Sequence, residues 1–201
     1  MRLSGLVVIS AALILASCGN GEKARLSNPN TPYLAGGYNN TQPPGTDGYD
    51  PISYWDGDGV SGRPSVTIYL NEQRAYFYKG DQLVGVSQVS AGREGHDTPA
   101  GTYKIMQKDP NHASSLYGDY VDALGNVVKK DVDVAKDPCP PGAHFKGAPM
   151  PHFMRITGGV GMHEGYLPGY PASHGCIRMP GKMALIFYNN VDIGTPVTIV
   201  K

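Results

Sequence analysis

Short runs of strand-forming residues, separated by turn signals, begin near Ser65 and continue to the C-terminus. The runs are VTIYL (66–70), AYFY (75–78), LVGVSQVS (83–90), TYKIM (102–106), FMRIT (153–157) and PVTIV (196–200). A KGDQ turn between the second and third runs indicates a hairpin, and the TPAG cluster at 98–101 indicates a turn before the fourth. Only 182–190 has the apolar spacing of a helix, after Pro180 and Gly181. The pattern predicts a mostly β domain, a sandwich or barrel of short strands with one or two helices.

Two segments lack this pattern. Residues 107–152 contain mainly polar stretches and are predicted to be a long insertion or lid in a catalytic domain at 65–201, with VDALGNVV forming a hairpin. Residues 18–64 are rich in glycine and proline and poor in aliphatic side chains, so they cannot bury enough apolar surface to offset the ordering entropy. We predict a flexible tether there, with aromatic residues such as Trp55 solvated rather than docked.

The first residues have the features of an export signal. Arg2 precedes an apolar run at 6–16 that is shorter than the roughly 20 residues needed to span a bilayer, so residues 1–17 are predicted to be a signal peptide. LASC at 15–18 resembles the lipobox of bacterial lipoproteins, which implies lipidation of Cys18. The expected location is the periplasmic face of a bacterial membrane, and Gly19 favours the outer membrane if the source is Gram-negative. An ordinary signal peptide is the alternative.

Charge and composition exclude several classes of partner. Lysine plus arginine (17) equals aspartate plus glutamate (17), and no charge run is present, so no nucleic-acid partner is expected.

Cys139, His144 and His152 are possible zinc ligands, but their spacing matches no standard pattern and prolines interrupt it. We therefore expect no metal and no cofactor.

The remaining cysteines allow two interpretations. In an exported protein, Cys139 and Cys176 are candidates for a disulfide bond. Cys176, however, follows Ser173-His174-Gly175 and lies 13 residues after His163. Glycine permits a tight turn, and a neighbouring imidazole converts a thiol into a useful nucleophile. This context favours a reactive Cys176 over a structural one.

His163 followed by Ser173-His174-Gly175-Cys176-Ile177-Arg178 resembles the signature of bacterial L,D-transpeptidases, the YkuD-like catalytic domain. The stretch from IYLNEQ to the TPxG turn and GTYKI resembles the opening of that domain, so the resemblance covers about 65–106 and 153–201. It implies the L,D-transpeptidase fold and a cysteine acyltransferase of peptidoglycan. Cys176 would attack stem tetrapeptides, form an acyl-thioester, and so cross-link or remodel the cell wall.

The resemblance also implies roles for single residues. Cys176 is the nucleophile, His163 the general base and acid, and the backbone N–H groups of Gly175 and Cys176 hold the oxyanion. Arg178 is a candidate for binding a stem carboxylate. Ser173 and His174 shape the turn and the substrate site, with His174 as the alternative base. Apart from the resemblance, Glu164 is adjacent to His163 and either orients the imidazole or faces solvent. Family chemistry further implies that carbapenems acylate Cys176.

Two alternatives to a transpeptidase remain open from the sequence. The first is an L,D-carboxypeptidase or hydrolase on the same scaffold, and the second is a non-catalytic wall-binding lipoprotein with a Cys139–Cys176 disulfide. For a transpeptidase, the acceptor is another stem, an anchored wall protein or a free D-amino acid.

Overall fold

The computed structural model describes residues 52–201, so the predicted signal peptide, Cys18 and most of the predicted tether lie outside the described residues. The mostly β prediction is confirmed. In chain order the elements are β1 (Tyr54–Trp55), β2 (Pro64–Tyr69), β3 (Arg74–Lys79), β4 (Gln82–Gln88), β5 (Gly101–Lys104), β6 (Gln107–Val121), β7 (Val127–Asp133), β8 (His144–Thr157), β9 (Val160–Glu164), β10 (Ile177–Met179), α2 (Gly181–Asn190) and β11 (Pro196–Val200). No helix in this described part is long and apolar enough to cross a bilayer.

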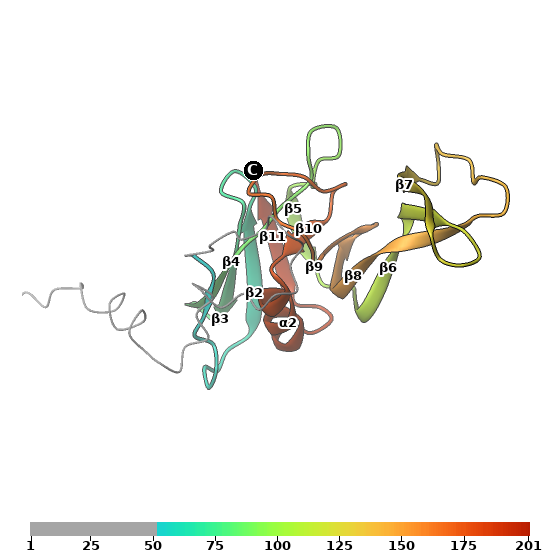
Figure 1. Ribbon diagram of the computed structural model, residues 1–201. Helices are drawn as coiled ribbons and strands as arrows, with labels where there is room; N and C mark the ends of the chain where they lie inside the picture. Colours follow the sequence, from blue (N-terminus) through green and yellow to red (C-terminus); the bar gives the residue numbers. More distant parts are fainter. Residues whose placement is uncertain (1–51) are drawn as a thin grey trace, which may run out of the picture. The chain divides into compact units, whose positions relative to one another are not determined.

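The strands form two sheets (Figure 1). The six-stranded sheet has the order β1-β4-β3-β2-β11-β5, and the predicted hairpin joins β3 to β4, where Lys79 pairs with Gln82. The five-stranded sheet has the order β10-β9-β8-β6-β7. Helix α2 packs against β8 and β9. Inward-facing side chains of both sheets and the helix share one core, which includes Ile68, Phe77, Met154, Met162, Ile177 and Phe187.

Trp55 corrects the predicted boundary of the tether. β1 pairs with β4, with Trp55 opposite Gly85, and the Trp55 side chain is only 1% exposed. Its ring packs edge-on against Phe77, with centroids 5.1 Å apart. The residues before Ser65 have few aliphatic side chains, but an aromatic side chain such as that of Trp55 buries about 150–250 Å². The folded domain therefore includes β1.

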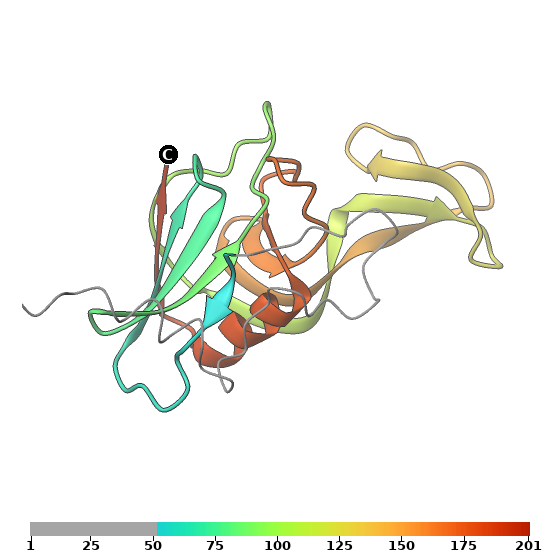
Figure 2. The same cartoon turned by 60° about the vertical axis from the view of Figure 1, so that its left-hand side comes forward.

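The segment 107–152 is not a loop insertion but an arm of paired strands. β6 and β8 pair from Gln107 opposite Arg155 to Val121 opposite His144, and β7 adds a third strand to the distal part. The predicted VDALGNVV hairpin is present, with Val121 opposite Val127. Figures 1 and 2 show this arm extending away from the six-stranded sheet. β6 is mostly polar, and β6 and β7 bury only Tyr120, Val121 and Val132, so backbone pairing with a few buried side chains holds the arm together.

Candidate active site

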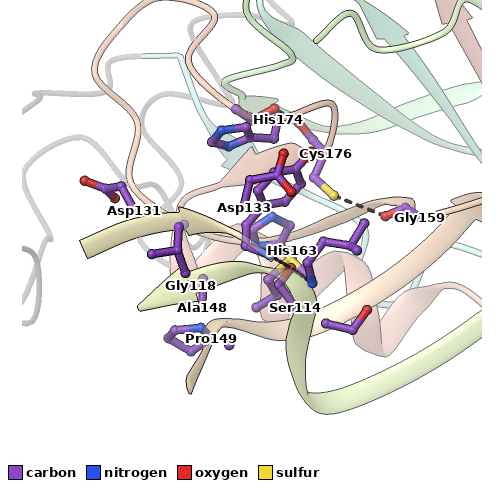
Figure 3. A pocket seen from close by; sticks show the side chains of 18 of the residues that line it. Ser114, Gly118, Asp131, Asp133, Ala148, Pro149, Gly159, His163, His174 and Cys176 are labelled. Atoms are coloured by element: carbon purple, nitrogen blue, oxygen red, sulfur yellow. Dashed lines mark hydrogen bonds between the residues drawn. The ribbon is translucent and has the colours of Figure 1, made fainter. Parts of the chain in front are cut away.

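The predicted site residues lie around one cavity of about 900 Å³ between the turn at 173–176, strand β9 and the arm. Figure 3 shows Cys176, His163 and His174 with residues of the arm around this cavity. The residues that line it include Arg93, His96, Tyr117, Asp133, Arg155, Gly159, His163, Ser173, His174, Cys176 and Arg178. The arm thus supplies one wall of the cavity, and the turn at 173–176, strand β9 and neighbouring loops supply the other.

Two parallel strands place the histidine beside the cysteine turn. β10 pairs with β9 so that Arg178 lies opposite His163, and paired residues of neighbouring strands face the same side of a sheet. Ile177 is fully buried on the core side. Cys176 and Arg178, one residue to either side of Ile177, therefore face the cavity together with His163.

The turn at 173–176 is closed by its own hydrogen bonds. The buried Ser173 hydroxyl donates to the Cys176 carbonyl and accepts from the Gly175 N–H at 3.0 Å. Gly175 has φ +110°, a conformation that essentially only glycine adopts without strain. Because the Gly175 N–H is used inside the turn, the expectation that it holds the oxyanion needs correction. The Cys176 N–H remains as the candidate donor of that pair.

Cys176 is a half-buried free thiol. Its Sγ donates to the Gly159 carbonyl at 3.5 Å. Burial raises the pKa of the thiol, while the Gly161 N–H and the charges of Arg178 and Arg155 act in the opposite direction. Cys139 is also free and exposed, on the loop between β7 and β8. The two described cysteines form no disulfide. The structure therefore offers no support for the alternative of a non-catalytic lipoprotein with a Cys139–Cys176 disulfide.

The geometry of His163 fixes which ring nitrogen is available. Nδ1 lies 2.6 Å from the backbone carbonyl of Glu164. A carbonyl oxygen can only accept, so Nδ1 carries the proton and Nε2 keeps its lone pair. His163 is 6% exposed, and burial lowers its pKa to about 4. The ring is therefore neutral near pH 7 and able to take a proton at Nε2.

His174, the alternative base, is held differently. Its Nε2 lies 2.8 Å from an Nη of Arg93, and a guanidinium can only donate, so this nitrogen is an acceptor already in use. The ring also stacks on Tyr117 of the arm, with centroids 4.2 Å apart. Desolvation and then the charge of Arg93 lower the pKa of His174 to about 4. His174 thus links the turn to the arm.

From the sequence, Glu164 is a candidate for orienting His163, and Arg178 is a candidate for binding a carboxylate of the substrate. The backbone carbonyl of Glu164, rather than its carboxylate, orients His163, while the carboxylate lies 3.5 Å from Nδ1 of His152. Arg178 is half-buried, and no acidic side chain within residues 52–201 forms a salt bridge with it. Burial lowers the pKa of Arg178 below the usual arginine value, and the nearby Cys176 opposes that shift. Arg178 is free to bind an anion in the cavity.

Several residues at the site were not predicted from the sequence. Arg93 and Tyr117 contact His174, and Gly159 and Gly161 contact the thiol through their backbones. Backbone contacts leave no residue-type signal, although the Gly-Gly pair at 158–159 marks a tight turn. Within residues 52–201 no group of three or more histidine, cysteine or acidic side chains is arranged to hold a metal ion.

Comparisons with known proteins agree with this geometry. The model of the L,D-transpeptidase catalytic domain family, YkuD, matches residues 63–199. A probable L,D-transpeptidase 3 of Mycobacterium tuberculosis is 30% identical over 144 residues, which are 71% of this chain and 47% of that protein. The chain therefore spans about half the length of this curated relative.

Solved structures show the same fold. An L,D-transpeptidase from Mycobacterium smegmatis aligns with a TM-score of 0.53 and 18% identity, covering 69% of this chain and 59% of that one. The L,D-transpeptidase of Enterococcus faecium aligns with a TM-score of 0.51 and 22% identity, covering 69% of this chain and 50% of that one. With residues 63–199 matched by the family model, this chain belongs to the L,D-transpeptidase catalytic domain family.

Proposed function

We propose that this protein is a cysteine L,D-transpeptidase that joins peptidoglycan stem peptides through an acyl-thioester on Cys176. The donor is a stem tetrapeptide, and the bond broken is the L,D bond between its third and fourth residues. The acceptor is an amine, typically the side-chain amine of the diamino acid in another stem.

In this reaction His163 and Cys176 have separate roles. His163 Nε2 takes the thiol proton as Cys176 Sγ attacks the scissile carbonyl, and then returns it to the departing amine of D-alanine. The acceptor amine attacks the thioester, gives its proton to His163 and expels the Cys176 thiolate, which then takes that proton back from His163. Because the pKa of His163 is low and that of Cys176 is raised, the resting pair is a neutral imidazole and a thiol, and proton transfer accompanies attack.

Two further groups complete the site. The Cys176 N–H is the candidate donor to the oxyanion, and one such donor is typically worth about 10²–10³ in kcat. Arg178 provides an unpaired guanidinium for a stem carboxylate, since its planar fork matches carboxylate geometry. The observation that carries the proposal is that His163 lines the same cavity as Cys176, with a bond from Nδ1 to the Glu164 carbonyl that leaves Nε2 as an acceptor.

Analysis of muropeptides tests the reaction. Purified protein incubated with tetrapeptide muropeptides is expected to release D-alanine and to produce dimers linked between the third residues of two stems. Mass spectrometry of the products measures both. Tripeptide monomers without dimers would instead identify a hydrolase that uses the same thioester, and no release of D-alanine would contradict the proposal.

We also propose that the protein is lipid-anchored through Cys18 at the periplasmic face of a bacterial membrane, because LASC at 15–18 resembles a lipobox. Two or more acyl chains anchor a protein stably. Cys18→Ala is expected to release the protein into the soluble periplasmic fraction or to leave it unprocessed, as measured by fractionation and intact mass. A variant that matures and fractionates like the wild type would contradict the anchor.

A further inference from the structure

The cysteine turn is attached to the segment that follows β4. Ser90 pairs with Arg178 through two backbone hydrogen bonds, and the Arg93 N–H donates to the Ser173 carbonyl at 3.1 Å. Gly92 approaches so closely that a Cβ there would lie 2.0 Å from the His96 carbonyl oxygen. The segment 90–98 therefore folds back on itself directly beneath the turn.

One side chain connects the two ends of this segment to the turn. The Thr98 hydroxyl accepts from the Gly92 N–H at 2.9 Å and donates to the Gly175 carbonyl at 2.8 Å. Thr98 is only 3% exposed. Pro99 follows it and restricts its backbone to extended conformations. The hydroxyl thus has a fixed position and both of its partners.

The bond to the Gly175 carbonyl has a consequence for the next residue. The peptide unit between Gly175 and Cys176 is planar and trans, so its C=O and N–H point in opposite directions. A carbonyl held toward Thr98 therefore aims the Cys176 N–H away from Thr98. Ser173 holds the neighbouring Gly175 N–H and Cys176 carbonyl, which leaves the Thr98 bond to set the rotation of this one peptide unit.

We propose that Thr98 is a positioning residue that aims the oxyanion donor of Cys176. The inference rests on the proposed cysteine acyl-transfer function and deepens it. Thr98 itself touches neither substrate nor thiol. It acts on the one backbone N–H that stabilises negative charge on the carbonyl under attack, and an aimed donor needs no reorganisation when that charge develops.

The test compares two reactions of the Cys176 thiol in full-length protein that carries Cys139→Ser, because iodoacetamide would also alkylate the exposed Cys139. Acylation by a carbapenem creates an oxyanion, whereas alkylation by iodoacetamide displaces iodide from carbon and creates none. Thr98→Val keeps the shape of the side chain but removes the hydroxyl. We expect its maximal acylation rate to fall about 10-fold or more, part of the roughly 10²–10³ that one oxyanion donor supplies, with the carbapenem concentration for half-maximal rate and the alkylation rate little changed.

Thr98→Ser is the matched control, because it keeps the hydroxyl and is expected to restore the acylation rate. If Thr98→Val does not fold, Thr98→Ala removes the hydroxyl without placing a methyl group against Gly92 and Gly175, and the same comparison applies. Intact mass against time measures both reactions, and thermal unfolding shows whether each variant is folded.

Two outcomes would overturn the proposal. One is an unchanged acylation rate in folded Thr98→Val. The other is an equal fall in acylation and alkylation, which would show that Thr98 only keeps the thiol in place. A wild-type protein that forms no adduct at all would contradict the proposed function. The proposed role of Thr98 would then be rejected as well.

Discussion

Incubation with a carbapenem is expected to add the mass of one carbapenem to the wild-type protein and none to Cys176→Ser or Cys176→Ala. The β-lactam carbonyl occupies the place of the scissile stem carbonyl, and ring opening leaves a thioester on Cys176. A serine hydroxyl ionises far less readily than a thiol, and His163 with its low pKa is too weak a base to compensate. We expect a loss of at least about 10⁴-fold, the scale seen when a catalytic nucleophile is removed. Intact mass spectrometry is the measurement.

Cys139 provides the control for this experiment. It is exposed, and its thiol donates to the Ala143 carbonyl at 3.2 Å, on the loop between β7 and β8. Cys139→Ser should therefore be acylated like the wild type. An adduct that forms at full rate in Cys176→Ser, or a stoichiometric Cys139–Cys176 cross-link in unreduced, fully active protein, would contradict the assignment of the nucleophile.

The parts of the fold that could be predicted are those in which burial selects the residue type. β2 alternates buried Val66 and Ile68 with less buried neighbours, and α2 buries Met183, Ala184 and Phe187 on one face. Such periodicity is visible in the sequence. The strand β6 is mostly polar and buries only Tyr120 and Val121 at its end, so its sequence contains no sustained period to detect.

The groups of the site likewise fall into those that the sequence could predict and those that it could not. The roles expected of Cys176 and His163 could be inferred from the sequence because such chemistry requires particular side chains in a particular order. The Gly159 carbonyl, the Gly161 N–H and the Glu164 carbonyl act through the backbone, which any residue provides. The oxyanion role expected for the Gly175 N–H needs correction for a related reason. The sequence shows that a serine lies two residues earlier, but not that its hydroxyl captures this N–H.

His163→Ala is expected to slow carbapenem acylation by about 10²–10⁴-fold at neutral pH, the usual contribution of a positioned general base. His174→Ala should have a smaller effect, because Nε2 of His174 already accepts from Arg93 and cannot take the thiol proton. The rate of adduct formation, followed by intact mass, measures both. A larger loss in His174→Ala than in folded His163→Ala would keep the enzyme class and reverse the choice of base.

The pH dependence separates a lost base from a damaged turn. In the wild type the reactive form has a neutral His163, so the acylation rate should rise with pH through the pKa of about 4 and then remain level. Without His163 the rate depends on spontaneous ionisation of Cys176, whose pKa burial raises above the ordinary thiol value. The deficit of His163→Ala should therefore shrink as the pH is raised above neutral. A deficit that stays constant from neutral to alkaline pH would mean that the variant disturbs the site in some other way than by removing a base.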